Sequence, residues 1–219
     1  DELDRMLLQP GRLPQTLHLA FGAERCRWRL GEAAHYTLEE AQQHRRWRVE
    51  DGPPPTPRHA LYLDLWTRLH PLPVPERDEI LSEIRAWAAL PLAGRPGNFP
   101  LSSEETLRLA ESDLIELGAH TVNHAPLSMH SAEEQRREIE ESKLALEARL
   151  GRPVASFSYP HGLYTPDTLS LTREAGYTYA CAVEDHSVRS GANPFALPRA
   201  VVSDEGGDAF ARWLAGAFA

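Results

Sequence analysis

The sequence predicts an α/β fold over residues 101–219 and a mostly helical region with one β-hairpin over residues 1–100. In the second half, short apolar segments alternate with helical patterns of about 10 to 20 residues. Turn-forming residues separate these segments, and such alternation is typical of a parallel sheet or barrel whose crossovers are helices. In the first half, predicted strands and helices do not alternate regularly, so we interpret it as a mostly helical insert.

The elements of the first half follow from the spacing of its apolar residues. On one predicted strand Cys26, Trp28 and Leu30 alternate with arginines, which gives an apolar face and a polar face. Thr37 is expected to begin a helix because acidic residues follow it in the first turn. The predicted helices are 1–9, 37–48, 59–69 and 76–90, the hairpin strands are 17–21 and 26–30, and the loops are 51–57 and 91–100.

Capping residues mark the elements of the second half. Ser131 is expected to cap a long polar helix, with Glu134 completing a capping box and Gly151 ending the helix. Pro166 is expected to open a further helix. The predicted helices are 102–110, 131–150, 166–175 and 208–218, and the predicted strands are 114–119, 154–159, 179–183 and 199–202.

The composition narrows the classes of function. The 219 residues include 42% hydrophobic and 25% charged side chains, which are ordinary globular values. A net charge of −9 argues against nucleic-acid binding, and no apolar run reaches the roughly 18 residues of a membrane span. Cys26 and Cys181 are far apart, so neither a disulfide framework nor a thiolate zinc site is expected. Low cysteine use slightly favours the cytoplasm, but the sequence leaves the compartment open.

The first residues already have the pattern of a helix interior. Leu3, Met6 and Leu7 share one face, and the only capping residue before them is Asp1. The opening residues have no signal-peptide pattern. We therefore expect the natural N-terminus to lie upstream of Asp1.

Candidate chemistry lies where predicted strands end, because ligands of α/β folds bind at the carboxyl ends of strands. His120 and His124 follow the strand predicted at 114–119, and two imidazoles four residues apart on a helical turn can chelate one metal ion. A zinc protease would have Glu in place of Thr121, so that reading is disfavoured. Two imidazoles leave a catalytic zinc site one protein ligand short, and the alternative is a pair of histidines without a metal.

Two other strand ends carry candidate ligand groups. Residues 158–162 predict a tight turn whose backbone N–H groups could form an oxyanion hole, or simply an ordinary strand-to-helix loop. Arg199, at the start of the last predicted strand, could bind an anionic or acetamido group, or it could be structural.

These segments, in this order, resemble the polysaccharide deacetylases of carbohydrate esterase family four, the NodB homology group. His120-Thr-Val-Asn-His124 resembles the family's metal motif His-Ser/Thr-x-x-His. Phe157-Ser-Tyr-Pro-His-Gly162 resembles a variant of its Arg-x-Pro-Tyr/Phe-Gly motif, and Phe195-Ala-Leu-Pro-Arg199 resembles the Leu-Pro-Arg motif of one subgroup. The resemblance covers about residues 100–202, and residues 57–62 resemble a helical insertion of that subgroup.

The resemblance implies a distorted (β/α)7 barrel, N-terminally incomplete in this chain, and N-deacetylation of an N-acetylated sugar or polysaccharide. In the family a divalent metal, for which zinc is the first expectation, polarises the acetyl carbonyl and activates a water. Carried over, His120 and His124 are the metal ligands, and the backbone N–H of His161 is a catalytic oxyanion donor. The residues expected to bind or shape the substrate are Tyr159, Pro160, Gly162 and Arg199.

The chain also departs from the family pattern. The Thr-Phe-Asp-Asp motif, which supplies the third metal ligand and the general base, has no match and would precede residue 1. Ser158 occupies the position at which the family has an arginine that orients the general base. Arg199 occupies the position of the family's general-acid histidine, and His186 is a candidate to replace that histidine. We therefore expect the chain alone to be inactive, and the open edge of its sheet to pair with the missing segment or with another chain.

Two alternatives to an enzyme are open. The first is a non-catalytic carbohydrate-binding module or degenerate deacetylase, which would bind sugar without a tight metal. The second is a protein-interaction domain in which Trp47, Trp66 and Trp87 anchor an interface, although tryptophans at helical spacing are more often core residues. Turnover of an acetylated chitooligosaccharide would favour the enzyme over both.

Overall fold

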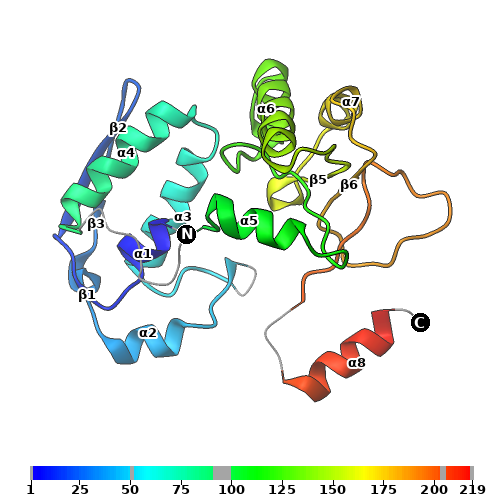
Figure 1. The fold of residues 1–219 in the computed structure, drawn as a ribbon. Helices are drawn as coiled ribbons and strands as arrows, with labels where there is room; N and C mark the ends of the chain where they lie inside the picture. Colours follow the sequence, from blue (N-terminus) through cyan, green and yellow to red (C-terminus); the bar gives the residue numbers. More distant parts are fainter. Residues whose placement is uncertain (1, 50–51, 91–99, 203–205, 218–219) are drawn as a thin grey trace. The chain divides into compact units, whose positions relative to one another are not determined.

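The computed structural model describes residues 2–49, 52–90, 100–202 and 206–217 of the chain (Figure 1). The chain divides into two compact units, Asp1–Phe99 and Pro100–Ala219. Each unit has an apolar core of its own. None of the helices in these described ranges is both long and apolar enough to cross a bilayer.

The first unit combines helices with two short antiparallel sheets. Its hairpin pairs β2 (Thr16–Phe21) with β3 (Glu24–Arg29) and confirms the predicted alternation, with partly buried Cys26 and Trp28 between exposed arginines. Helix α2 (Leu38–His44) begins after Thr37, as predicted, where the structure adds a capping box with Glu40, but it ends short of residue 48. The other elements are α1 (Glu2–Leu7), β1 (Gly11–Arg12), the 3-10 turn η1 (Gly31–Ala34), β4 (His35–Tyr36), α3 (Pro57–Leu69) and α4 (Val74–Trp87).

A buried arginine joins the elements of the first unit. Leucines of α1, β2 and α3 meet isoleucines of α4 in the core, and Trp66 and Trp87 pack against it. Arg58, on the first turn of α3, is only 1% exposed. Its five N–H donors bond at 2.6–3.1 Å to five backbone carbonyls, those of Leu7, Gln9, Gly11, Ala33 and Ala34.

The second unit contains a short parallel sheet. Strands β5 (Ser156–Ser158) and β6 (Tyr179–Cys181) pair in parallel and are connected by α7 (Pro166–Glu174), while α6 (Ala132–Leu150) precedes β5. Single parallel bridges extend the sheet on both sides, from Ala119 to Phe157 and from Leu197 to Cys181. The other elements are α5 (Ser103–Ala110), the 3-10 turns η3 (Leu127–Met129) and η4 (Pro160–Gly162), and α8 (Gly207–Ala217).

The two faces of this sheet differ. Phe157 and Ala180 are buried in one core with Ile139 of α6 and Leu171 of α7, and both helices lie along the same side of the strands (Figure 1). Side chains alternate along a strand, so the residues on either side of Phe157 and Ala180 face away from this core. That opposite face is polar: Ser156, Ser158, Tyr179 and Cys181.

Most predicted elements of the second half are confirmed, but two strands are wrong. In the segment 114–119 only Ala119 makes a bridge, and Leu114 and Ile115, which suggested a buried strand, are exposed, Leu114 to 96%. The segment 199–202 forms no strand either, since the parallel contact falls earlier, at Leu197. The described residues are mixed α/β and do not show a closed barrel. Most of the predicted loop 91–100 lies outside the described residues.

Candidate active site

His120 and His124 lie together on the loop that follows the Ala119 bridge. Their ring centroids are 4.9 Å apart, with the ring planes inclined at 64°. The predicted helical turn is wrong, because Thr121 and His124 have φ values of 66° and 54°. A strained loop, rather than one face of a helix, brings the two imidazoles together. Such strain concentrates at functional sites in proteins.

The orientation of His120 is set by the end of β5. Its Nδ1 lies 2.6 Å from the carbonyl oxygen of Ser158. A carbonyl oxygen can only accept, so Nδ1 donates and Nε2 keeps the lone pair that a metal ion needs. Metal-ligating histidines are oriented in this way, with a backbone carbonyl or a carboxylate fixing the tautomer.

Glu138 holds the loop between the two histidines, and the sequence interpretation missed it. Its carboxylate accepts from the backbone N–H groups of Val122 and Asn123 and from the Asn123 side-chain amide. The side chain lies on α6 and is 1% exposed. No signal in the sequence pointed to it, because Glu138 is one of several acids on α6 and the positions of this helix that the structure buries are mostly polar: Gln135, Glu138, Ile139 and Ser142.

The turn after β5 brings a third imidazole to the pair. His161 has a φ of 57°, and its ring centroid is 4.8 Å from that of His124. Gly162 follows with a φ of 71°, and a Cβ there would lie 2.6 Å from the Cβ of Val183. A tight turn was predicted here, but the prediction concerned only the backbone of His161 and gave no role to its ring.

Tyr159 and Pro160, which were expected to shape a sugar site, lie beneath this turn. Tyr159 is fully buried, and its hydroxyl donates to the carbonyl of Phe195 at 2.8 Å. Burial raises the pKa of Tyr159 to about 12. Pro160 is buried as well. Both side chains position the turn from within the core.

A cavity of about 390 Å³ lies on the polar face of the sheet, and His120 and Arg199 both line it. Glu116 in its wall accepts from the Tyr179 hydroxyl at 2.7 Å, which lowers the pKa of this carboxyl group. The hydroxyl oxygen of Ser158, another lining residue, is buried and has no hydrogen-bond partner within the described residues. The residues that line this cavity therefore include an acid, an imidazole and a guanidinium, those of Glu116, His120 and Arg199.

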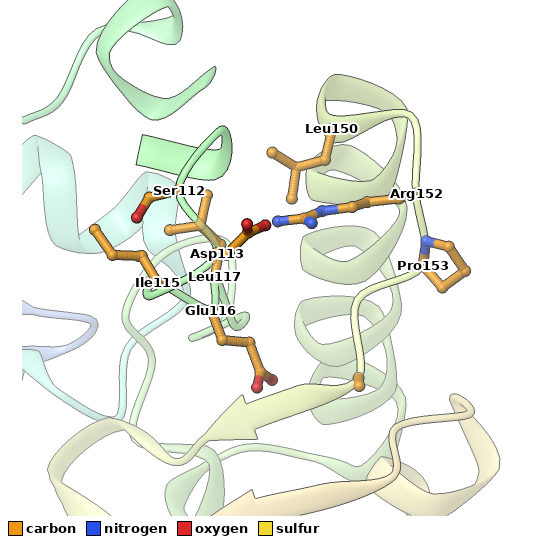
Figure 2. A pocket seen from close by; sticks show the side chains of 9 residues that line it. Ser112, Asp113, Ile115, Glu116, Leu117, Leu150, Arg152 and Pro153 are labelled. Carbon is orange, nitrogen blue, oxygen red and sulfur yellow. The ribbon is translucent and has the colours of Figure 1, made fainter. Parts of the chain in front are cut away.

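A second cavity, of about 350 Å³, shares Glu116 with the first. Figure 2 shows the Asp113 carboxylate and the Arg152 guanidinium facing one another across it. Leu150 and Pro153 complete much of its wall (Figure 2). None of the predicted site residues lines this cavity, so we place the candidate site at the first one.

The two histidines fit a metal ion in donor type, and His120 also in its orientation, but two ligands are too few. Two imidazole nitrogens are suitable donors for zinc, and His120 already has the required tautomer. Across the described ranges, however, no group of three or more His, Cys, Asp or Glu side chains could hold a metal ion. A third protein donor would have to come from elsewhere.

Known proteins share the segment that carries these residues. Residues 82–180 match the family model described as polysaccharide deacetylase. YxkH of Bacillus subtilis, which is named for this family, is 26% identical over 113 residues, 51% of this chain and 40% of that protein. The poly-β-1,6-N-acetyl-D-glucosamine N-deacetylase of Staphylococcus aureus is 23% identical over 113 residues, 48% of this chain and 39% of that protein.

Solved structures of deacetylases are also similar. The Streptococcus pyogenes deacetylase PplD, in complex with acetate, is 20% identical with a TM-score of 0.49, covering 53% of this chain and 51% of that one. A Bacillus cereus polysaccharide deacetylase is 21% identical with a TM-score of 0.48, covering 54% and 38%. The chain spans about 40% of the length of the curated relatives it matches. The segment that matches the polysaccharide deacetylase family model, residues 82–180, includes all three histidines of the candidate site and makes up just under half of the chain.

Proposed function

We propose that this chain is part of an enzyme that removes acetyl groups from an N-acetylated sugar or polysaccharide, using a divalent metal ion, with zinc as the first choice. The observation that carries the proposal is the His120–His124 pair, in which the Ser158 carbonyl orients His120. The pair lies within the segment that matches the family. The name of the Staphylococcus aureus relative supports an N-acetylglucosamine polymer as the substrate class.

His120 and His124 would hold the metal as neutral nitrogen donors. The metal, when bound, would polarise the acetyl carbonyl and lower the pKa of a water molecule. The Ser158 carbonyl keeps the proton of His120 on Nδ1, so that Nε2 is the donor nitrogen.

The substrate would be held from the turn after β5 and from the cavity rim. The backbone N–H of His161 would donate to the oxyanion that forms when the acetyl carbon becomes tetrahedral. Gly162, Tyr159 and Pro160 fix the shape of this turn. Arg199 is exposed and lines the same cavity as His120, where its guanidinium would bind an acetamido oxygen or an anionic group.

The third metal ligand and the general base would come from outside the described residues. The motif that supplies both in the resembling family has no match in this sequence. We propose that another part of the whole protein, or another chain, provides them by pairing beside Ala119 at the edge of the sheet. On this account the 219 residues alone do not turn over substrate.

A second candidate function is sugar binding without catalysis. It is favoured by the finding that the described residues hold no set of three metal-ligating side chains. Such a module would bind acetylated oligosaccharides and release no acetate.

Acetate release from an N-acetylglucosamine oligomer separates these functions. The whole gene product is assayed with zinc, beside His120→Ala and the matched control His18→Ala, whose side chain is exposed on β2. We expect turnover in the wild type and the control, and a loss of at least about a hundredfold in His120→Ala. Sugar binding without acetate release would establish the module. If the protein neither binds the sugar nor releases acetate, both candidate functions are rejected.

A further inference from the structure

We propose that Glu138 is the positioning residue of the site: its buried carboxylate binds the backbone of the His120–His124 loop and thereby keeps the two imidazoles together. The consequence for metal binding rests on the proposed function. The effect of Glu138 on the conformation of the loop is independent of the proposed function.

The contacts of Glu138 all converge on the residues between the two histidines. Oε2 accepts from the backbone N–H of Val122 at 2.9 Å and from that of Asn123 at 2.8 Å. Oε1 accepts from the side-chain amide of Asn123 at 2.6 Å. Two successive backbone N–H groups that point at one oxygen form an anion-binding concavity. Here the anion is a side chain of the same protein.

The packing of α6 does not require a carboxylate at this position. Ile139, next along the helix, is fully buried, and an apolar residue at 138 could be buried on the same stripe. Burying a carboxylate is costly unless hydrogen bonds satisfy it. Three N–H donors do so here, and the half-exposed guanidinium of Arg137 lies 3.8 Å away. The hydrogen bonds to the loop thus account for the buried charge.

The loop needs such a partner because its own backbone is strained. Thr121 and His124, on either side of the two bound amides, both have positive φ. This region is unfavourable for residues with a Cβ atom. Val122 and Asn123 present both N–H groups to one oxygen in this conformation. Glu138 therefore favours the conformation in which the imidazole centroids are 4.9 Å apart.

The pairing suggests a set of matched variants. In Glu138→Gln the oxygen can still accept from the backbone, but the new amide nitrogen faces the Asn123 amide, so that one hydrogen bond and the charge are lost. Adding Asn123→Asp exchanges the two groups, which restores the side-chain hydrogen bond with the same total charge. Glu141→Gln is the control, because Glu141 is exposed on the same helix.

Amide hydrogen exchange, measured by NMR on the metal-free full chain, tests the loop directly. We expect Glu138→Gln to speed exchange at Val122 and Asn123 by at least about tenfold, since these amides lose a charged acceptor. The double variant regains the side-chain hydrogen bond but not the charged acceptor, so it should recover part of the protection, and Glu141→Gln should match the wild type. Exchange in Glu138→Gln that equals the control overturns the inference. If Glu138→Gln does not fold, the double variant decides: protected amides support the inference, and unprotected amides overturn it.

A zinc competition titration of the same variants, made in the whole gene product that is to supply the third ligand, tests the consequence for the site. We expect Glu138→Gln to weaken zinc binding by at least about tenfold, as loss of outer-shell support does at metal sites. An affinity equal to that of Glu141→Gln would make Glu138 a purely structural residue and overturn its positioning role. If the wild type binds zinc no better than His120→Ala, the proposed function fails instead, and hydrogen exchange still decides whether Glu138 holds the loop.

Discussion

Two buried charges organise the two units of this protein in different ways. Arg58 in the first unit and Glu138 in the second are each 1% exposed, and both bond mainly to backbone groups. The carbonyls that Arg58 binds belong to segments without a candidate site residue. Glu138 binds the backbone between two candidate metal ligands. Burial alone therefore does not reveal the role of a charged side chain; the segment that it binds does.

The largest effect is expected from Arg58→Met, which tests the structural side of this comparison. The substitution leaves five carbonyl groups without their donor, two of them, those of Leu7 and Ala34, in buried hydrogen bonds. We expect the first unit to lose about 3–5 kcal/mol of unfolding free energy. Urea denaturation followed by tryptophan fluorescence measures it, with the exposed Arg27→Met as the control. Equal stability of the two variants would contradict the account.

The next effect is a pH dependence of the first unit, caused by His59. Burial, then His44 and Arg58, lowers the pKa of this 3% exposed imidazole to about 4. Above about pH 6.5 the imidazole is neutral in both states and carries no penalty. As the pH falls from about 6.5 to 4, the unfolded state takes up a proton that the folded state does not, so stability is lost, by up to about 3 kcal/mol.

His59→Asn isolates this contribution from that of the carboxylates. The unfolding free energy of the first unit is measured at pH 7 and pH 4.5 for both proteins. We expect the wild type to lose about 2 kcal/mol more than the variant between these values. An identical loss in both would show that His59 does not resist protonation.

Gly162→Ala sharpens the comparison of buried charges with other ways of fixing a loop, because close packing rather than a charged side chain fixes the turn after β5. The added Cβ would meet Val183 at 2.6 Å, and the φ of 71° is unfavourable for alanine. We expect a loss of about 2 kcal/mol in the second unit. Gly191→Ala, with a φ of 80° and open space, carries the backbone strain alone and should cost about 1 kcal/mol. Equal losses would mean that the contact with Val183 does not matter.

The smallest effect is expected from Tyr179→Phe in the cavity wall. The change removes the hydroxyl that donates to Glu116 and is the main cause of its lowered pKa. We expect the pKa of Glu116 to rise toward its ordinary value, with a stability change of about 1 kcal/mol or less. An NMR titration of the Glu116 carboxyl group in both proteins checks this. An unchanged titration would show that the hydrogen bond does not form in solution.

Local chemistry predicted much of the fold. The caps at Thr37 and Ser131 act through their own hydroxyls and the backbone three residues later, so the sequence around them is sufficient. Gly151 ends α6 with a φ of 65°, which is equally local. The hairpin also follows from alternation between adjacent segments.

The errors arise where a distant partner decides the structure. The run 114–119 is apolar enough for a buried strand, yet the bridge to β5 forms only at Ala119. The His120–His124 pair was found from its spacing, but the same spacing wrongly suggested a helical turn. The real loop has residues with positive φ, and its partner, Glu138, comes many residues later in the sequence. Glu138 itself is one acid among several on a polar helix, and its burial cannot be seen without the loop.

The most direct test of the central claim is a zinc titration of the whole gene product followed by NMR of the imidazole rings. If His120 and His124 form a metal-binding pair, zinc shifts the ring resonances of both together, and His120→Ala abolishes the shift at His124. The exposed ring of His18 should not respond. Zinc that leaves both rings unshifted, or binds His120→Ala as tightly as the wild type, would contradict the account.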